Sequence, residues 1–218
     1  MENDVKDFLS ELLKQLKSID YIKPEDIPNI DLYMDQVTTF MDEQLAASKR
    51  YESDKILTKT MINNYAKNNL LPSPDKKKYS KEHVLTLLFI YYFKNILSIN
   101  DIRSILNPLT EKYFGNDDGF TMQDVYTEVF SLEAEESQKL LKDLGKKYKI
   151  AGETFEDFPD EDQKFLHTFS FICMLSFDVY IKKMLIERMI DDLNEEKEAS
   201  KKNRLKLTSL FFFPPMIN

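Results

Sequence analysis

The sequence lacks several residue types on which large classes of proteins depend. It has one cysteine, Cys173, so the chain can form neither an internal disulfide nor a multi-cysteine metal site. It has four glycines and no tryptophan among 218 residues, whereas folds that cradle phosphates in glycine-rich loops need several residues free to adopt positive φ. The hydrophobic fraction of 42% is ample for a core. These features together favour a helical protein in a reducing compartment.

Signals for export and for membrane insertion are also missing. The segment Met1–Phe8 opens with acidic residues where a signal peptide would be basic and then apolar. The most apolar stretch, Phe165–Phe177, is shorter than the roughly 18 to 20 residues that span a bilayer. We therefore expect a cytoplasmic protein that makes no membrane contact.

Residues that could support catalysis or bind metal have simpler explanations. His83 lies at the start of a predicted helix and His167 lies beside an apolar stripe, which favours structural roles for both. The acidic stretch Glu153–Asp162 lacks the ligand spacing and central glycine of a calcium loop. Metalloprotease, hydrolase, P-loop and dinucleotide motifs do not occur. The sequence predicts no catalytic residue, no metal and no cofactor.

The charge is distributed unevenly along the chain. The formal net charge is −8, yet residues 49–83 contain nine lysines and arginines against four acids, a local excess of about five positive charges. Phosphate attraction acts locally, so an acidic chain can still carry a basic face. A solvated lysine-rich loop is the simpler explanation of the same pattern.

Apolar spacing predicts three helices in the first third of the chain. Residues 5–19 form the first, and a proline-containing connection follows it. The second begins with Asp31 as its cap. The third is short: Thr58 caps it, and Asn69 ends it in the left-handed conformation that asparagine tolerates.

Two further helices are predicted in the middle of the chain. Ser80 caps a helix that is apolar over most of its circumference between Val84 and Leu97, which predicts a place at the centre of the core. Ser98 then caps a shorter helix that Pro108 closes.

The C-terminal half is predicted to be helical as well. Thr121 caps a helix that Gly145 interrupts, and the acidic stretch Glu153–Asp162 forms a linker or the entry to a helix. A long helix then runs from about Phe165 to Glu196 or beyond, which implies either bending or a helix shared with a second subunit. The aromatic tail Leu205–Asn218 should dock on its own chain or on a neighbour.

One region of the sequence resembles a known family of DNA-binding proteins. The stretches Leu57–Pro72 and Lys78–Ile102 are similar to the second helix, the Gly-Leu-Leu-Pro turn, the wing tyrosine and the following helices of MerR-type transcription regulators. The resemblance covers Asp31–Asn107 and implies a winged helix-turn-helix. The layout of the whole chain also resembles a bacterial family of unknown function that begins with such a domain.

The resemblance implies a role for two groups of residues. In the family, the second helix enters the major groove, the wing touches the DNA backbone, and a C-terminal helix pairs two subunits. Asparagine can address adenine, whereas lysine and threonine suit phosphates, and the Tyr79 ring is favoured to pack against the core. The implied nucleic-acid-binding residues are Lys59, Thr60, Asn63, Asn64, Lys67, Lys76, Lys77, Lys78 and Tyr79.

Two departures from the family pattern leave a second hypothesis open. Asn63-Asn64-Tyr65 stands where the family has Arg-Tyr-Tyr, so an arginine and a tyrosine that usually touch DNA are absent. An extended polar segment, Asp42–Ile56, separates the first two helices of the motif instead of a tight turn. The chain could therefore be an interaction adaptor that keeps the fold without binding DNA.

The sequence thus predicts an all-α protein in three parts. Residues 1–30 form an N-terminal helix and linker, residues 31–114 a MerR-like winged helix-turn-helix domain, and residues 115–218 a helical domain for dimerisation. The leading hypothesis is a homodimeric, non-enzymatic transcription regulator that binds duplex DNA, with no effector identified.

Overall fold

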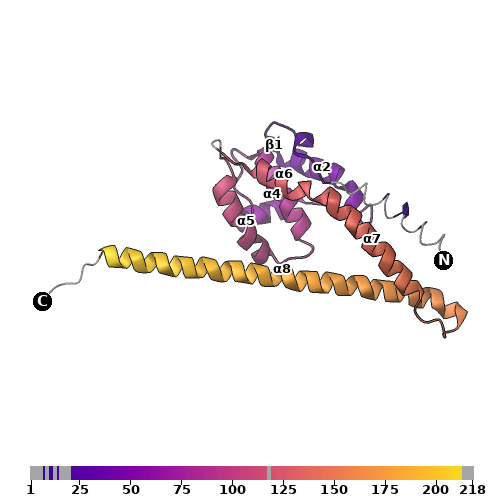
Figure 1. Cartoon of the computed structure of the whole chain (residues 1–218). Coiled ribbons are helices and arrows are strands. Elements are labelled where there is room, and N and C mark those ends of the chain that lie inside the picture. The colour runs from indigo at the N-terminus through magenta and orange to yellow at the C-terminus, as the bar shows by residue number, and fades with distance from the viewer. Residues whose placement is uncertain (1–6, 8–9, 12–13, 15–20, 117–118, 213–218) are drawn as a thin grey trace.

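The structure, a computed structural model, describes residues 7, 10–11, 14, 21–116 and 119–212, without the side chains of 133–135 and 203–212. The described part is mostly helical and contains one sheet of two short strands, which confirms the predicted helical class. Residues 21–131, which we name the head, form a compact group of elements (Figure 1). Helix α7 (Glu133–Gly152) leads away from the head, and the long helix α8 (Asp160–Phe212) runs back past it (Figure 1). The helix predicted over 5–19 and the docking predicted for the tail from Leu205 lie largely outside this description.

Most of the predicted elements are present, with small shifts at their ends. The elements are η1 (Pro24–Asp26), β1 (Leu32–Tyr33), α2 (Met34–Gln44), η2 (Ala46–Ser48), α3 (Lys59–Lys67), β2 (Lys78–Tyr79), α4 (Lys81–Phe93), α5 (Ile99–Tyr113), α6 (Met122–Ser131), α7 (Glu133–Gly152) and α8 (Asp160–Phe212). Within the described ranges, no helix has a segment apolar and long enough to traverse a bilayer.

The start of α2 differs from the prediction. Asp31 is exposed and does not cap this helix, because the chain first forms strand β1. Tyr33 is the capping residue, and its backbone N–H donates to Oε1 of Gln36 at 2.9 Å. Strand β1 pairs antiparallel with β2, so the chain on either side of α3 is joined by a sheet that local apolar spacing did not reveal.

Helix α4 is the centre of the head. Its residues from His83 to Tyr91 are all buried, which confirms the position predicted from its apolar circumference. On α6, Met122 and Tyr126 are buried, whereas Val129 is half exposed. The Tyr126 hydroxyl donates to the Ile22 carbonyl at 2.9 Å. The core therefore extends beyond the predicted domain boundaries at 31 and 114.

Pro108 does not close α5, which continues to Tyr113. A proline inside a helix removes one backbone N–H and leaves the carbonyl four residues earlier, here that of Ser104, without its helical partner. Lys197 of α8 supplies a substitute, because its Nζ donates to the Ser104 carbonyl oxygen at 2.6 Å. Nearby, Ile190 of α8 is buried in the core cluster of the head. The proline is thus tolerated through a contact with a helix far along the sequence.

Gly145 does not interrupt α7, and this prediction was also wrong. A glycine within a helix costs about 1 kcal/mol relative to alanine, a penalty that packing can offset. Helix α7 packs on the start of α8, where the rings of Tyr148 and Phe171 meet edge to face at 5.4 Å. Lys147 forms hydrogen bonds to Asp143 and Asp178, which raise the pKa of Lys147. These contacts join α7 and α8 into a helical hairpin.

Helix α8 passes Glu196, as the sequence suggested, and is one continuous element of 53 residues. At 1.5 Å per residue its length is about 80 Å. Phe171 and Ile190 are its only buried residues in the part whose side chains are described. Most of the apolar side chains predicted at helical spacing on α8 therefore face away from the rest of the chain.

Candidate nucleic-acid interface

Helix α3 forms where the sequence predicts it and presents a polar outer face. The Thr58 hydroxyl accepts a hydrogen bond from the Met61 backbone N–H at 3.2 Å, which caps the first turn. Ile62 and Tyr65 are buried and attach the inner face to the core. The outer face consists of exposed Lys59, Thr60, Asn63, Asn64 and Lys67.

The chain leaves α3 through a turn that fixes its direction. Asn69 has φ of 55°, and the Leu70 N–H donates to the Tyr65 carbonyl at 2.9 Å. The Asn69 N–H donates to the Ala66 carbonyl at 3.2 Å, which completes a Schellman motif. Leu70 and Leu71 are then buried.

A tight turn exposes the lysines that follow α3. We name Asp75–Tyr79 the lysine loop. The Lys78 N–H donates to the Asp75 carbonyl at 2.8 Å, and the two central residues, Lys76 and Lys77, have φ of 46° and 64°. Positive φ at both central residues is the signature of a type I′ turn, which usually contains asparagine or glycine. Two lysines here carry backbone strain, and the side chains of all three lysines are exposed.

Tyr79 differs from the other residues implied by the resemblance. Its side chain is 3% exposed, so the ring is unavailable as a contact surface. The ring meets His83 edge to face at 5.5 Å, and burial raises the pKa of Tyr79. Its backbone pairs with Leu32 of β1. Tyr79 therefore attaches the lysine loop to the core and is removed from the set of side chains that could touch a ligand.

The start of α3 and the lysine loop meet at the junction between β1 and α2. Lys59 forms an ion pair with Asp35. Lys78 pairs with Tyr33 in the sheet, and its Nζ lies 5.6 Å from the centroid of the Tyr33 ring. Because Tyr33 and Asp35 are two residues apart, the two lysine-bearing segments are neighbours in space.

The partners of these lysines differ. Asp35 neutralises Lys59, an interaction that the sequence analysis did not anticipate. In the described part of the chain, Lys67, Lys76 and Lys77 have no ion-pair partner. The unneutralised positive charge is therefore concentrated at the end of α3 and in the lysine loop.

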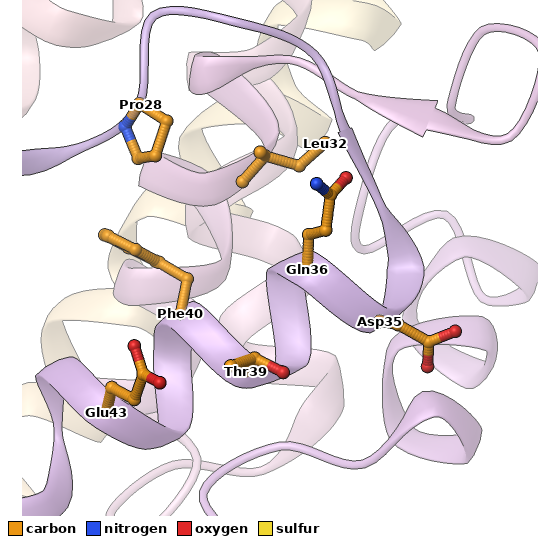
Figure 2. A pocket seen from close by; sticks show the side chains of 7 residues that line it. All are labelled: Pro28, Leu32, Asp35, Gln36, Thr39, Phe40 and Glu43. Carbon is orange, nitrogen blue, oxygen red and sulfur yellow. The ribbon is translucent and has the colours of Figure 1, made fainter.

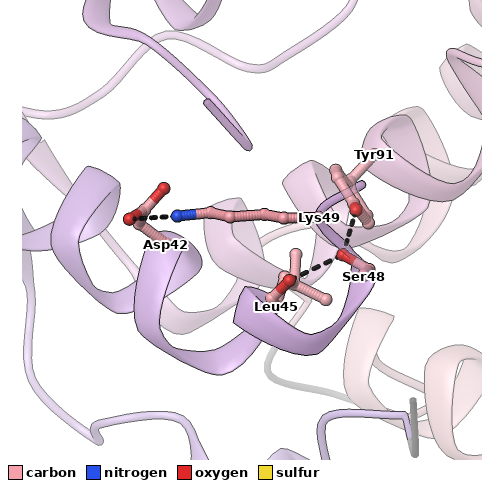
Figure 3. A network of polar contacts seen from close by, with 5 residues as sticks. All are labelled: Asp42, Leu45, Ser48, Lys49 and Tyr91. Carbon is pink, nitrogen blue, oxygen red and sulfur yellow. Dashed lines mark hydrogen bonds and ion pairs between the residues drawn. The ribbon is translucent and has the colours of Figure 1, made fainter. Parts of the chain in front are cut away.

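The long segment between α2 and α3 is held by polar contacts to α2, to α4 and to Lys94 at the C-terminus of α4. Ser48 forms a short hydrogen bond with the Tyr91 hydroxyl (Figure 3). Lys49 Nζ donates to Asp42 Oδ2 at 2.7 Å, which lowers the pKa of Asp42 (Figure 3). Further along, Lys94 Nζ donates to the Ile56 carbonyl at 2.7 Å. These contacts fix the position of α3 despite the length of the connection before it.

A groove beside α2 adds acidic groups to this side of the head. Pro28, Leu32 and Phe40 surround its apolar part, and Asp35 and Glu43 lie at its two ends (Figure 2). Its volume is 340 Å³. A second groove of 390 Å³ lies between α2 and α3 and includes Glu43, Asp42 and Lys59. Carboxylates of α2 therefore border the start of α3.

The two histidines make structural contacts. His83 Nδ1 accepts from the Ser80 N–H at 3.0 Å at the start of α4, and burial lowers the pKa of His83. Its ring also meets Phe114 edge to face at 4.7 Å. His167 Nε2 lies 2.8 Å from the Thr154 carbonyl oxygen, which joins α8 to the turn before it. A search of the described residues finds no group of histidine, cysteine and acidic side chains able to hold a metal ion.

Comparisons with known proteins give one match. No curated protein and no solved structure matches the chain. Residues 22–129 match a family described as a domain of unknown function, DUF1836. This segment is nearly coextensive with the head, so it includes α3 and the lysine loop, whereas α7 and α8 lie beyond it. The description assigns no activity, and the resemblance to MerR-type regulators stays a prediction.

Proposed function

We propose that this protein is a transcription regulator that binds duplex DNA through α3 and the lysine loop of a MerR-like winged helix-turn-helix. The observation that carries the proposal is the meeting of two exposed, lysine-bearing segments at the β1–α2 junction, one of them a capped helix. A helix fits the major groove, and a neighbouring turn can reach the adjacent backbone.

The exposed residues are suited to two kinds of DNA contact, one with base edges and the other with phosphates. Asn63 and Asn64 can form paired hydrogen bonds with adenine edges in the major groove. Among the described residues, no carboxylate pairs with Lys67, Lys76 or Lys77, so these lysines can contact phosphates. Lys59 contributes less, because Asp35 already neutralises it. Affinity from such contacts should fall steeply with salt as counterions are released.

A binding assay with genomic duplex fragments at low and moderate salt tests the proposal. We expect the variant Lys76→Glu/Lys77→Glu/Lys78→Glu to lose binding at every sequence. The matched control changes three exposed lysines of α7 to glutamate, at Lys142, Lys146 and Lys149, and should retain binding. Lys67→Gln should lower the slope of log affinity against log salt by about 1. The proposal is wrong if no fragment binds, or if the control variant is impaired as much as the triple variant.

The adaptor hypothesis has one specific observation in its favour. The carboxylates of Asp35, Asp42 and Glu43 border α3, and the ion pair of Lys59 with Asp35 interrupts the basic surface. The substitution Asp35→Asn separates the two hypotheses, because it frees Lys59 without removing a contact to the core. A DNA-binding protein should gain affinity for duplex DNA from this change, whereas an adaptor should show no DNA binding before or after it.

The proposed regulator acts as a homodimer joined through its C-terminal helices. Support comes from the exposed apolar side chains of α8, which the described part of the chain leaves uncovered. Two heads in one particle can bind two half-sites at once, which raises affinity and makes the spacing of the half-sites part of recognition.

A further inference from the structure

Helix α7 covers one side of α8 in the segment before α8 reaches the head. Residues four apart on a helix form a row along its surface, and four such rows cover the helix. Two adjacent rows are half-buried or buried as far as Asp178. Their contacts to α7 include the edge-to-face meeting of Phe171 with Tyr148 and the hydrogen bond of Asp178 with Lys147. These two rows therefore face α7.

The other two rows are exposed along the same segment. One contains Phe165, Phe169, Cys173, Phe177, Ile181 and Leu185. The other contains Thr168, Ile172, Ser176, Tyr180 and Met184. We name these two sets the exposed rows. They contain no charged residue and lie on the side of α8 that faces away from α7.

The middle of the exposed rows is the part that one straight helix can cover. Four residues correspond to about 400° around a helix, so each row turns by about 40° per step and leaves a straight partner after a few steps. The large apolar side chains in this middle part are between 39% and 65% exposed, and they are Phe169, Ile172, Phe177, Tyr180, Ile181 and Met184. At about 100 Å² for each, they leave on the order of 600 Å² in water. Two copies together supply about 1,200 Å², the area at which specific interfaces begin.

We infer that a second copy of this chain covers the exposed rows, with the two α8 helices crossing near Ser176. When rows of residues four apart on two helices interdigitate, the axes cross at about 50°, and this is the commonest class of helix packing in globular proteins. Two identical copies meet this condition, because the same surface serves both partners. The inference rests on the two-copy form in the proposed function and specifies its interface. It does not require DNA binding, and it is tested in the absence of DNA.

The charges at the ends of the second row favour crossing over lengthwise pairing. Lys164 lies 12 residues before Ser176 and Arg188 lies 12 residues after it, which is about 18 Å along the helix in each direction. A lengthwise antiparallel pair would place Lys164 of one copy beside Arg188 of the other, and a lengthwise parallel pair would place each beside its own copy. Like charges side by side are destabilising. Helices that cross at about 50° have diverged at this distance, so only the uncharged middle makes the contact.

Light scattering on the full chain without DNA tests whether this surface joins two copies. We expect twice the mass of one chain for the unmodified protein and the mass of a single chain for Phe177→Glu, because a second copy would bury the new charge. Phe177 is 65% exposed, so circular dichroism should show that the variant keeps its helices.

Val179→Glu is the matched control. Val179 is 63% exposed, almost the same as Phe177. The two residues are separated by about 200° around the helix, so Val179 points away from the first exposed row. We expect Val179→Glu to keep the double mass. A single-chain mass for the unmodified protein overturns the inference, as does a double mass for Phe177→Glu or a loss of assembly in both variants.

The native cysteine tests the position of the contact. Cys173 is exposed in the single chain and lies between Phe169 and Phe177 in the first exposed row. In the two-copy form it should be covered, so its thiol should react with dithiobis(nitrobenzoate) more slowly in the unmodified protein and in Val179→Glu than in Phe177→Glu. Equal rate constants in all three proteins would place the contact elsewhere and overturn the inference, even if the unmodified protein has the double mass.

Discussion

The head and helix α8 use apolar residues in opposite ways. In the head, α4 is buried from His83 to Tyr91, and the elements around it complete one core. On α8, large apolar side chains of the same types remain exposed for much of the helix. Burial of apolar area is the main favourable term in folding, so the core of the head should supply most of the stability of a single chain. The exposed segment of α8 contributes little until another surface covers it.

This contrast also separates two kinds of functional surface. The candidate DNA interface is polar and projects from a rigid core, so substitutions there should alter binding and leave folding intact. The α8 surface is apolar, so substitutions there should alter assembly. Substitutions at specific residues, followed by measurements of unfolding and of assembly, can therefore test whether the two surfaces differ in this way.

The largest expected effect is the loss of a buried side chain in the head. Leu88 is 0% exposed, and Leu88→Ala should lower the free energy of unfolding by about 2 to 5 kcal/mol. Phe177 on α8 is 65% exposed, and Phe177→Ala should change the free energy by less than about 0.5 kcal/mol. Denaturant unfolding of both variants, measured at the same low protein concentration, gives the difference. Equal losses would show that the α8 surface is packed within one chain.

A smaller effect is expected where α8 meets the head. Lys197→Met removes the donor to the Ser104 carbonyl, and an acceptor left without a partner costs about 1 to 3 kcal/mol. Pro108→Ala restores a backbone N–H that can bond to the same carbonyl. We therefore expect Lys197→Met to be harmful in the natural sequence and nearly neutral in the Pro108→Ala background. A double-mutant cycle of unfolding free energies measures this coupling, and additive effects would contradict the account of α5.

The contact between Lys197 and the Ser104 carbonyl explains why part of the fold was not predictable from the sequence. The caps at Thr58, Ser98 and Thr121 were predicted because each cap depends on residues within one turn of it. The passage of α5 through Pro108 depends on Lys197, a residue 89 positions away, and local rules gave the wrong end for this helix. Continuity of α7 through Gly145 has a similar origin in its packing on α8.

As with the fold, the local features of the candidate site were predictable from the sequence, and the features that depend on distant residues were not. The exposed residues of α3 follow from its helical period, because Ile62 and Tyr65 fix which face is buried. The ion pair of Lys59 with Asp35 was not foreseen, since it depends on the pairing of β1 with β2. The type I′ turn was missed because two lysines occupy positions where asparagine or glycine is the usual signal.

His83, which packs against Tyr79 at the base of the lysine loop, should make folding stability depend on pH. Burial lowers the pKa of His83 below its ordinary value of 6.5, while hydrogen bonding near Ser73 and Pro72 and the charge of Asp31 oppose the shift. The unfolded chain therefore binds a proton at higher pH than the folded chain does. Folding stability should be complete above pH 6.5 and fall as the pH drops from 6.5 towards the lowered pKa of the folded state.

Thermal unfolding at pH 7.5 and pH 5.5 measures this dependence. His83→Asn keeps an acceptor for the Ser80 N–H and removes the titrating group, so the difference between the two pH values should shrink in this variant. An unchanged difference would assign the pH dependence to other groups.

The smallest change in the free energy of unfolding is expected in the lysine loop. The same substitution should also change the affinity for DNA. Lys77 has φ of 64°, a conformation that glycine adopts without strain. We therefore expect Lys77→Gly to raise the free energy of unfolding by about 0.5 to 1 kcal/mol, since the turn loses strain. The same change removes a lysine that has no ion-pair partner among the described residues, so affinity for duplex DNA should fall and its salt dependence should weaken. Lys77→Asn tolerates positive φ nearly as well and also removes the charge, so the two variants should lose the same affinity while differing in stability. A gain in stability without any loss of DNA affinity would show that the strained turn has no role in binding DNA.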